Sequence, residues 1–503
     1  MLIQTMSKAE KRYFKLFASQ HTRNGSNNYI KLFDAIDKQP EYNEVKLRRK
    51  FSKESFGKKL AATKYLLYEL ILKSLKNFHS GKTIDSRLNS LLEEVDVLFN
   101  KTLYKQSRKV LCKAKRIARE SEKTFYLHRI SQWEKTLCGY LFTPECKGKA
   151  ETWLSESEAV TLKLQNEAQY LELAGKMRMF YEICLRKGGI CNQKAALKII
   201  KHPLLLEVES AMTFVSKLCF HEIHSIYARV NHNYHKAQRS LLKIAELWEQ
   251  NPGMVKVYAE WYKRTTGDLV LCALNTGKFS NYFSLIGKLR TLPVKCEQET
   301  LKRELWVTML EFGYYLHLGD LKQCEVLEKQ IRQVHFRHKD KLSSVWLIWL
   351  YFQLTVYYFM IADYDKAIDG MNRVQDYEKT GLLPYVQVFC KLLRIPVHYE
   401  LKNFHFLEYQ LRSTQRYLNR RERNGTVEKT FLKFMKKSLG TVGTKNLQEL
   451  FTELGQSLKD VESGSFSYLP LGDKAIKTWV NRKADKDILE TSNFDQVAEI
   501  LEF

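Results

Sequence analysis

Apolar residues recur every three or four positions along most of the chain, which is the period of an amphipathic α-helix. In residues 55–78, for example, Leu60, Leu67, Ile71 and Leu75 fall on one face of a helix. The alternating pattern of β-strands is missing. Only 8 Pro and 22 Gly occur in 503 residues, so helix breakers are rare. The pattern therefore predicts an all-α protein.

Residues 1–80 are predicted to form a separate, basic helical module. Ser7 and Glu10 have the spacing of a capping box, which marks the start of its first helix. Three further helices are expected at residues 29–37, 44–51 and 55–78. Such a module could be helix-turn-helix-like, or it could form the first hairpins of a longer array.

The remainder of the chain shows a repeated helical pattern, clearest in Leu354–Val374 (LTVYYFMIADYDKAIDGMNRV). Tyr358 ends a first helix, Ala362 lies in the turn, Tyr364 opens a second helix and Ala367 provides a small residue where the helices cross. This arrangement resembles the tetratricopeptide repeat. The resemblance implies an α-solenoid, in which helical hairpins stack along the chain.

Weaker copies of this pattern can be aligned by one anchor residue, the residue expected to open the second helix of each hairpin. The anchors are Tyr104, Tyr234, Phe279, Leu321, Tyr364 and Phe404. From the second anchor onward they are separated by about 40 to 45 residues. The longer gap after Tyr104 predicts two degenerate copies near residues 147 and 190, with breaks at Pro144–Gly148 and Gly188–Gly189.

These repeats are longer than the tetratricopeptide unit of about 34 residues. The crossing position also holds larger or polar residues in several copies, namely Ser107, Tyr282, Cys324 and Leu407. We therefore expect a TPR-like α-solenoid of about eight helical hairpins over residues 81–425, with longer helices or looser stacking. The opening segment SKAEKRYFKLF is similar to bacterial proteins of this architecture whose function is not known.

The pattern changes after residue 425. Breaks are expected at residues 439–443, 463–465 and 470–472, where glycine, serine and proline gather. Residues 426–503 are therefore predicted to form capping helices, which cover the last apolar face of the array, followed by a partly mobile tail.

The net charge of +26 is concentrated in the N-terminal third. Residues 1–80 hold 17 Lys and Arg against 7 Asp and Glu, and residues 81–150 hold 15 against 8. Such asymmetry favours an anionic partner, although a solvated basic surface would give the same count.

Basic residues gather at helical spacing in three places, before the long N-terminal helix, around residues 101–123 and after residue 411. The candidate residues for binding an anionic partner are Lys46, Arg48, Arg49, Lys50, Lys105, Arg108, Lys109, Arg116, Arg119, Lys123, Arg412, Arg416 and Arg420. A stripe of this kind can follow phosphates and release counterions, while a solvated helix face is the alternative.

No catalytic signature is present, so we expect neither an enzyme nor a cofactor. His221, His224, His232 and His235 could hold zinc only if one hairpin brought them together, and no metal site is predicted. Gly81-Lys82-Thr83 lacks the preceding strand and the glycine of a phosphate-binding loop.

The cysteines indicate where the protein is located, and hydropathy indicates whether the chain crosses a membrane. The ten cysteines have no CxxC pair, which suggests reduced thiols and a cytoplasmic protein. Residues 345–362 are nearly long enough to cross a bilayer, but Gln353, Thr355 and many aromatic residues favour a buried helix of the array. No membrane span is expected.

These observations favour a non-catalytic adaptor or scaffold that binds a protein or peptide partner on the solenoid surface. The alternative is a nucleic-acid- or ribosome-associated factor that contacts DNA or RNA through the basic N-terminal third. A transcriptional regulator would combine the two.

Overall fold

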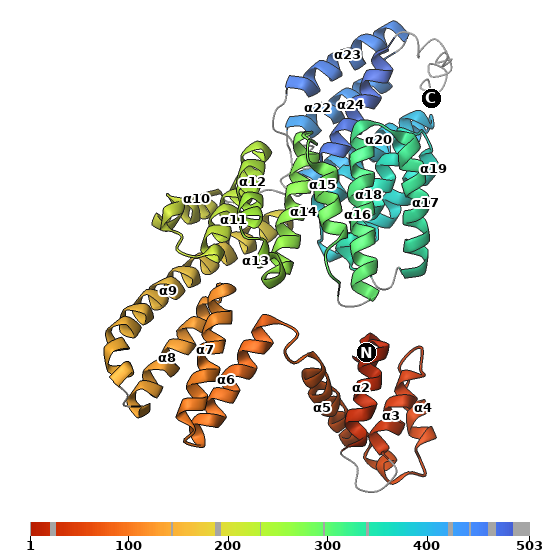
Figure 1. Cartoon of the computed structure of the whole chain (residues 1–503). Coiled ribbons are helices and arrows are strands. Elements are labelled where there is room, and N and C mark those ends of the chain that lie inside the picture. Colours follow the sequence, from red (N-terminus) through yellow and green to blue (C-terminus); the bar gives the residue numbers. More distant parts are fainter. Residues whose placement is uncertain are drawn as a thin grey trace. The chain divides into compact units, whose positions relative to one another are not determined.

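The computed structural model is helical throughout the part of the chain that it describes, and no strand occurs there (Figure 1). That part comprises residues 2–20, 27–141, 144–186, 193–231, 233–294, 297–338, 342–420, 426–441, 444–460 and 469–485. The chain divides into two compact units, residues 1–165 and 166–503. The prediction of an all-α fold is confirmed for these described ranges.

The N-terminal helices of unit 1 enclose a small core of their own. They are α1 (Leu2–Thr5), α2 (Lys8–Ser19), α3 (Asn28–Asp37), α4 (Glu44–Lys50), the 3-10 helix η1 (Ser55–Lys59) and α5 (Leu60–His79). Phe14 and Phe33 stack at its centre, with ring centroids 4.6 Å apart. The capping box is present, because the Ser7 amide donates to Glu10 over 2.7 Å and the Glu10 amide donates to Ser7 Oγ over 3.2 Å.

Three further helices and part of a fourth complete unit 1. They are α6 (Ile84–Asn100), α7 (Tyr104–Glu120), α8 (Thr124–Leu141) and α9 (Pro144–Arg186). Their core is formed by α6, α7 and α8 around Leu88, Leu111 and Ile130. The prediction of a degenerate hairpin near residue 147 was wrong in one respect. No turn interrupts the helix there, because α9 continues unbroken for 43 residues. Gly148 lies within this helix, and the predicted break at Gly188–Gly189 lies outside the described residues.

Most of unit 2 consists of helix pairs joined by short turns. Its helices are α10 (Gln193–Ile200), α11 (Phe214–Val230), α12 (Tyr234–Gln250), α13 (Pro252–Val257), α14 (Ala259–Thr276), α15 (Tyr282–Arg290), α16 (Glu297–Leu318), α17 (Leu321–His338), α18 (Ser344–Met360), α19 (Tyr364–Gln375), α20 (Pro384–Glu400), α21 (Phe404–Arg420), α22 (Thr426–Leu439), α23 (Thr444–Asp460) and α24 (Pro470–Ala484). We call α11, α14, α16, α18 and α20 the first helices, because each packs against the helix that follows it as its hairpin partner. The first helices α14, α16, α18 and α20 also contact one another in succession.

Four of these hairpin turns, and the α6–α7 turn of unit 1, share one backbone hydrogen bond. In the α18–α19 turn, Ala362 has a left-handed φ of 59°, and the Asp363 amide donates to Tyr358 O, five residues back, over 2.9 Å. This is the 6→1 bond of a Schellman motif, which satisfies a carbonyl that the helix end leaves free. The same bond joins residues 103 to 98, 233 to 228, 320 to 315 and 403 to 398.

Five of the six anchor residues are the first residues of helices that follow such turns. These helices are α7, α12, α17, α19 and α21, which begin at Tyr104, Tyr234, Leu321, Tyr364 and Phe404. The sixth anchor was wrong, because Phe279 lies in the turn and α15 begins at Tyr282. Here the turn contains Gly277 with a φ of 67°.

The crossing position, three residues after each anchor, is buried in every copy whatever its size. Its residues Ser107, Ala237, Tyr282, Cys324, Ala367 and Leu407 are at most 1% exposed. The two polar members are satisfied by backbone, since Ser107 Oγ donates to Val95 O and Tyr282 Oη donates to Leu310 O. The larger side chains are therefore accommodated by neighbouring helices rather than excluded.

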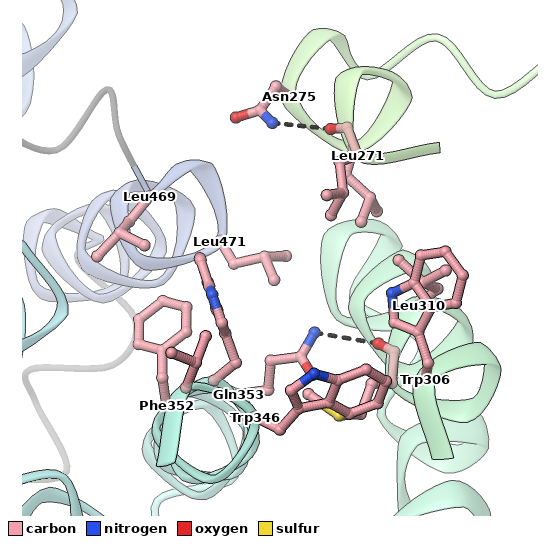
Figure 2. Close-up of a pocket in the computed structure, with 13 residues that line it drawn as sticks. Leu271, Asn275, Trp306, Leu310, Trp346, Phe352, Gln353, Leu469 and Leu471 are labelled. Carbon is pink, nitrogen blue, oxygen red and sulfur yellow. Dashed lines mark hydrogen bonds between the residues drawn. The ribbon is translucent and has the colours of Figure 1, made fainter. Parts of the chain in front are cut away.

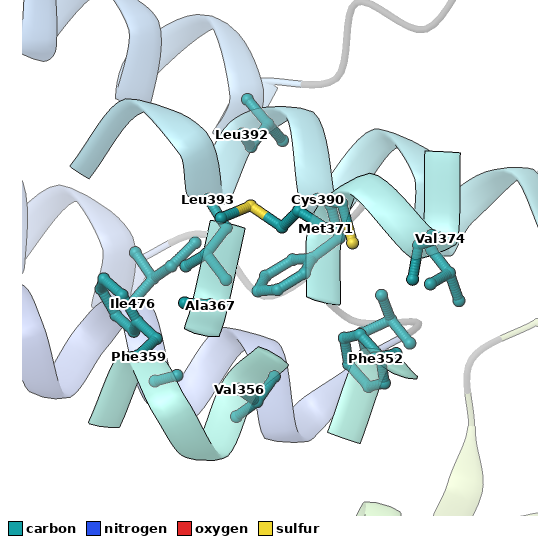
Figure 3. Packing of buried hydrophobic residues seen from close by; sticks show 14 of the residues in the cluster. Phe352, Val356, Phe359, Ala367, Met371, Val374, Cys390, Leu392, Leu393 and Ile476 are labelled. Carbon is teal, nitrogen blue, oxygen red and sulfur yellow. The ribbon is translucent and has the colours of Figure 1, made fainter. Parts of the chain in front are cut away.

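Helix α18 is the apolar segment that was predicted to be a buried helix. Its residues pack with α19, α20 and α24, and Figure 3 shows Phe352, Val356 and Phe359 within this core. No helix in the described ranges is long and apolar enough to cross a membrane.

In the described part of residues 426–503 the structure has three helices, α22, α23 and α24. Pro470 and Gly472 were expected to break the pattern, but they belong to the first turn of α24, where proline is tolerated because that amide has no helical acceptor. The predicted mobile tail from residue 486 onward lies outside the described residues.

Helices α18 and α19 approach each other closely at Gly370 in α19. A Cβ atom there would lie 2.3 Å from Thr355 Oγ1, whereas a Cβ at Gly175 in α9 would have no neighbour within 4 Å. We expect Gly370→Ala to lower the free energy of unfolding by about 1–3 kcal/mol through overpacking. Gly175→Ala should raise it by roughly 0.5–1 kcal/mol, because alanine favours a helix. Denaturant unfolding of both variants checks this, and equal effects would contradict the close contact.

Candidate functional site

Helix α24 contacts the first helices α16 and α18, and its basic residues reach the C-terminal ends of three first helices in succession. Lys474 Nζ donates to His317 O at the end of α16. Arg482 donates to Met360 O at the end of α18 over 3.4 Å, and Lys483 Nζ lies 2.9 Å from Glu400 Oε1 at the end of α20. Free carbonyls and the negative end of the helix dipole make these ends favourable for cations.

A tryptophan anchors the same helix. Trp479 Nε1 donates to Glu400 Oε1 over 2.6 Å. Its ring lies against Tyr399 and Phe451, with centroid distances of 6.0 and 5.4 Å. Helix α20, together with Phe451 of α23, therefore holds α24 through an indole that donates a hydrogen bond.

An open apolar pocket lies beside the start of α24 (Figure 2). It has a volume of about 280 Å³. Its walls come from α14, α16 and α18, and from the residues around the start of α24. The lining residues are Leu271, Leu274, Asn275, Trp306, Met309, Leu310, Val345, Trp346, Trp349, Phe352, Gln353, Leu469 and Leu471. None of these side chains is charged, so the pocket suits a neutral apolar group.

Gln353 is the most buried polar residue of the lining, with 7% of its surface exposed. Its Nε2 donates to Met309 O over 3.0 Å, and Figure 2 shows this bond. Its Oε1 is buried and has no hydrogen-bond partner among the described residues. An unsatisfied buried acceptor of this kind costs about 1–3 kcal/mol, which a ligand with a donor would recover.

Sequence reasoning did not identify this pocket. Trp346 and Trp349 lie in residues 345–362, which were predicted only as a buried helix, and Gln353 served only as an argument against a membrane span. The available signal was the presence of tryptophans on two segments in the same region of the repeat, at Trp306 and Trp346. Three hairpins build the walls, so sequence spacing alone could not bring them together.

The basic stripe on α7 is only partly free. Lys105, Lys109 and Arg116 are exposed, and no ion pair involves them within the described ranges. By contrast, Arg119 pairs with Glu156 at 3.0 Å and Lys123 pairs with Asp85 at 3.0 Å.

Two further residues of this helix change the description of the stripe. Arg108 is half-buried, with its guanidinium 5.8 Å from the centroid of the Trp153 ring. Lys113, which the prediction omitted, is exposed between Lys109 and Arg116 and extends the stripe.

The N-terminal basic cluster lies on α4. Lys46, Arg48, Arg49 and Lys50 are all exposed. Arg48 pairs with Glu44 at 2.8 Å. The Lys64 ammonium, and after it the Arg48 guanidinium, lower the pKa of the Glu44 carboxyl to about 2.

The third basic cluster lies on α21, in unit 2. Arg412 forms an ion pair with Glu408 one turn earlier, and Arg416 is exposed. The side chain of Arg420 lies outside the described part of the chain. The candidates on α4 and α7 thus belong to unit 1, and those on α21 to unit 2.

The histidine group does not form a common site in the described chain. The His224 ring forms a hydrogen bond of 3.1 Å with Leu205 O. Burial lowers the pKa of the His221 ring to about 4. His235, by contrast, is exposed to solvent. His232 lies outside the described residues. Among the residues that the structure describes, no group of His, Cys, Asp or Glu is arranged to hold a metal ion.

The cysteines differ from the expectation at one position. Burial raises the pKa of Cys219, Cys272, Cys324 and Cys390 to about 12, so these thiols are protonated and unreactive at neutral pH. Cys184, in contrast, is disulfide-bonded.

Comparison with known proteins adds no assignment, because no family model matches the chain and neither a curated protein nor a solved structure matches it. The argument for function therefore depends on the geometry of α24, the pocket and the basic stripe.

The contacts of Trp479 predict how firmly α24 is held. Trp479→Ala removes a buried ring and its hydrogen bond, which should cost about 3–5 kcal/mol. We expect amide hydrogen exchange over residues 470–484 to accelerate at least about tenfold, since local opening becomes easier. The control is Lys477→Ala, because the one ion pair of Lys477 within the described residues is with Asp473 of the same helix, at 2.8 Å. Unchanged exchange in the Trp479 variant would contradict the docking described here.

Proposed function

We propose that this chain is a non-catalytic TPR-like adaptor that binds a segment of a protein or peptide partner on the surface of its first helices. The observation that carries the proposal is the open pocket on α14, α16 and α18, with its tryptophan lining. Aromatic residues that line an apolar pocket are typical centres of binding energy at protein interfaces. Helical stacks expose long surfaces of this kind, and partner binding is a common use of them.

The position of α24 supports the same proposal. It lies against α16 and α18, next to the pocket. A surface that already binds a helix of its own chain is suited to bind a second helix beside it. A partner segment would continue along this surface from α24, with an apolar side chain in the pocket.

We also propose a cytoplasmic location. The free cysteines support it, including Cys219 and Cys390 in the core, whereas the disulfide at Cys184 argues for a less reducing compartment.

Pocket occupancy can be tested by one surface substitution. Leu271 lines the pocket and is 42% exposed, so Leu271→Arg should place a charge at the pocket without unfolding the protein. Leu242 on α12 is 41% exposed and lies outside this pocket, so Leu242→Arg is the matched control.

We expect quantitative affinity capture from native lysate, with nuclease added, to recover a protein that wild type and Leu242→Arg retain. Its recovery with Leu271→Arg should fall at least about tenfold, because burying an unpaired charge opposes binding. If both variants recover the same proteins in the same amounts, the pocket is not the binding site.

The alternative function, binding of DNA, RNA or the ribosome through the N-terminal third, is favoured by one observation. Lys105, Lys109 and Arg116 form an exposed stripe with no ion pair inside the described ranges. A phosphate backbone would supply the missing anions, with release of counterions.

The stripe predicts a salt-dependent interaction. For Lys105→Glu/Lys109→Glu we expect weaker binding of a random-sequence RNA and a DNA duplex in fluorescence anisotropy. The slope of log affinity against log salt should fall by about two. Lys236→Glu/Arg239→Glu on α12 makes the same change of charge at exposed positions and serves as the control. Equal binding by the two variants, or salt-independent binding, would exclude this alternative.

A further inference from the structure

We infer that the pocket on α14, α16 and α18 takes a tryptophan side chain of the partner, whose indole N–H is bound by Gln353 Oε1. This inference rests on the proposed function, because it names the anchor that the partner inserts. Its support comes from the size of the pocket, its polar group and the neighbouring helix α24.

The size and lining of the pocket fit one aromatic ring system. An engineered cavity of roughly 150 Å³ holds benzene, so about 280 Å³ has room for the larger indole. Trp306, Trp346, Trp349 and Phe352 offer ring faces and edges for stacked or perpendicular contacts. Such contacts add to the gain from buried area.

The polar requirement of the pocket is a single neutral donor. Gln353 Nε2 is committed to Met309 O, which fixes the amide so that Oε1 is the free atom. At Gly313 a Cβ atom would lie 3.0 Å from this Nε2, so the absence of a side chain there leaves room for the amide. A lysine or arginine donor does not fit, because no carboxylate lines the pocket to offset the cost of burying its charge.

Helix α24 is held by the same kind of contact that the pocket could offer, an indole that donates a hydrogen bond and packs against aromatic rings. Trp479 donates its indole N–H to Glu400 while its ring packs against Tyr399 and Phe451. Helix α20, together with Phe451 of α23, thus already binds one indole through an acceptor and aromatic neighbours. The pocket, with Leu471 of α24 at its edge, offers an equivalent arrangement to a second indole.

The donor requirement is tested by comparing indole with 1-methylindole, which has the same ring system but no N–H. Ligand-observed NMR titration of the full chain measures both dissociation constants. We expect indole to bind about tenfold more tightly, the value of one hydrogen bond of about 1.4 kcal/mol.

Gln353→Met removes the acceptor at similar size, so the preference for indole should fall to about onefold. Gln387 is the matched control, because it is also buried on a first helix, with 3% exposure, and donates to Val374 O over 2.7 Å. Gln387→Met should keep the tenfold preference, and thermal unfolding shows whether both variants are folded.

Three outcomes would overturn the inference: equal binding of the two probes to wild type, an unchanged preference in Gln353→Met, or no binding of either probe. If the probes show no preference while Leu271→Arg still loses the partner, the anchor is wrong and the adaptor function stands. If the preference for indole depends on Gln353 but no partner is captured, the site is supported and the adaptor function is not.

Discussion

The turn inside each hairpin is the constraint on which the rest of unit 2 depends. A left-handed residue followed by the 6→1 bond reverses the chain within three residues, as at Ala362 and Asp363. Ala362 and Lys402 hold this position without being glycine, and a left-handed conformation costs such residues roughly 1–2 kcal/mol. That cost is offset because the turn satisfies a helix-end carbonyl and brings the crossing residue, such as Ala367, into the core.

The first helices α16, α18 and α20 each end in such a turn, and each has its last residues next to α24. His317, Met360 and Glu400 lie at three of these ends, and α24 contacts all three. The same helix brings Leu469 and Leu471 to the pocket. The candidate binding surface is therefore a consequence of hairpin repetition together with the position of one C-terminal helix.

The sequence was sufficient for local structure and insufficient for the site. Hydrophobic period and capping residues located α2 to α5 closely, and the anchor residues located the starts of five second helices. Phe279 misled because an aromatic residue can lie in a turn as well as open a helix. The merging of two expected helices into α9 was missed because Gly148 was taken as a break, although one glycine costs a long helix only about 1 kcal/mol.

The pocket and the docking of α24 depend on contacts between residues more than 100 positions apart, such as Arg482 and Met360. Hydrophobic period gives the face of a helix but not which distant helix covers it. The ion pairs of Arg119 and Lys123 were hidden for the same reason, since their partners lie on other helices. Charge counts alone could not separate the free part of the basic stripe from the neutralised part.

The docking of α24 has a consequence for how this protein can diverge in sequence. Lys474 and Arg482 bind main-chain oxygens, those of His317 and Met360, and every residue type provides such an oxygen. Substitutions at the ends of α16 and α18 can therefore change the side chains without removing the acceptors. The attachment of α24 can persist while the side chains around it change, so the residues that line the pocket are free to vary as well.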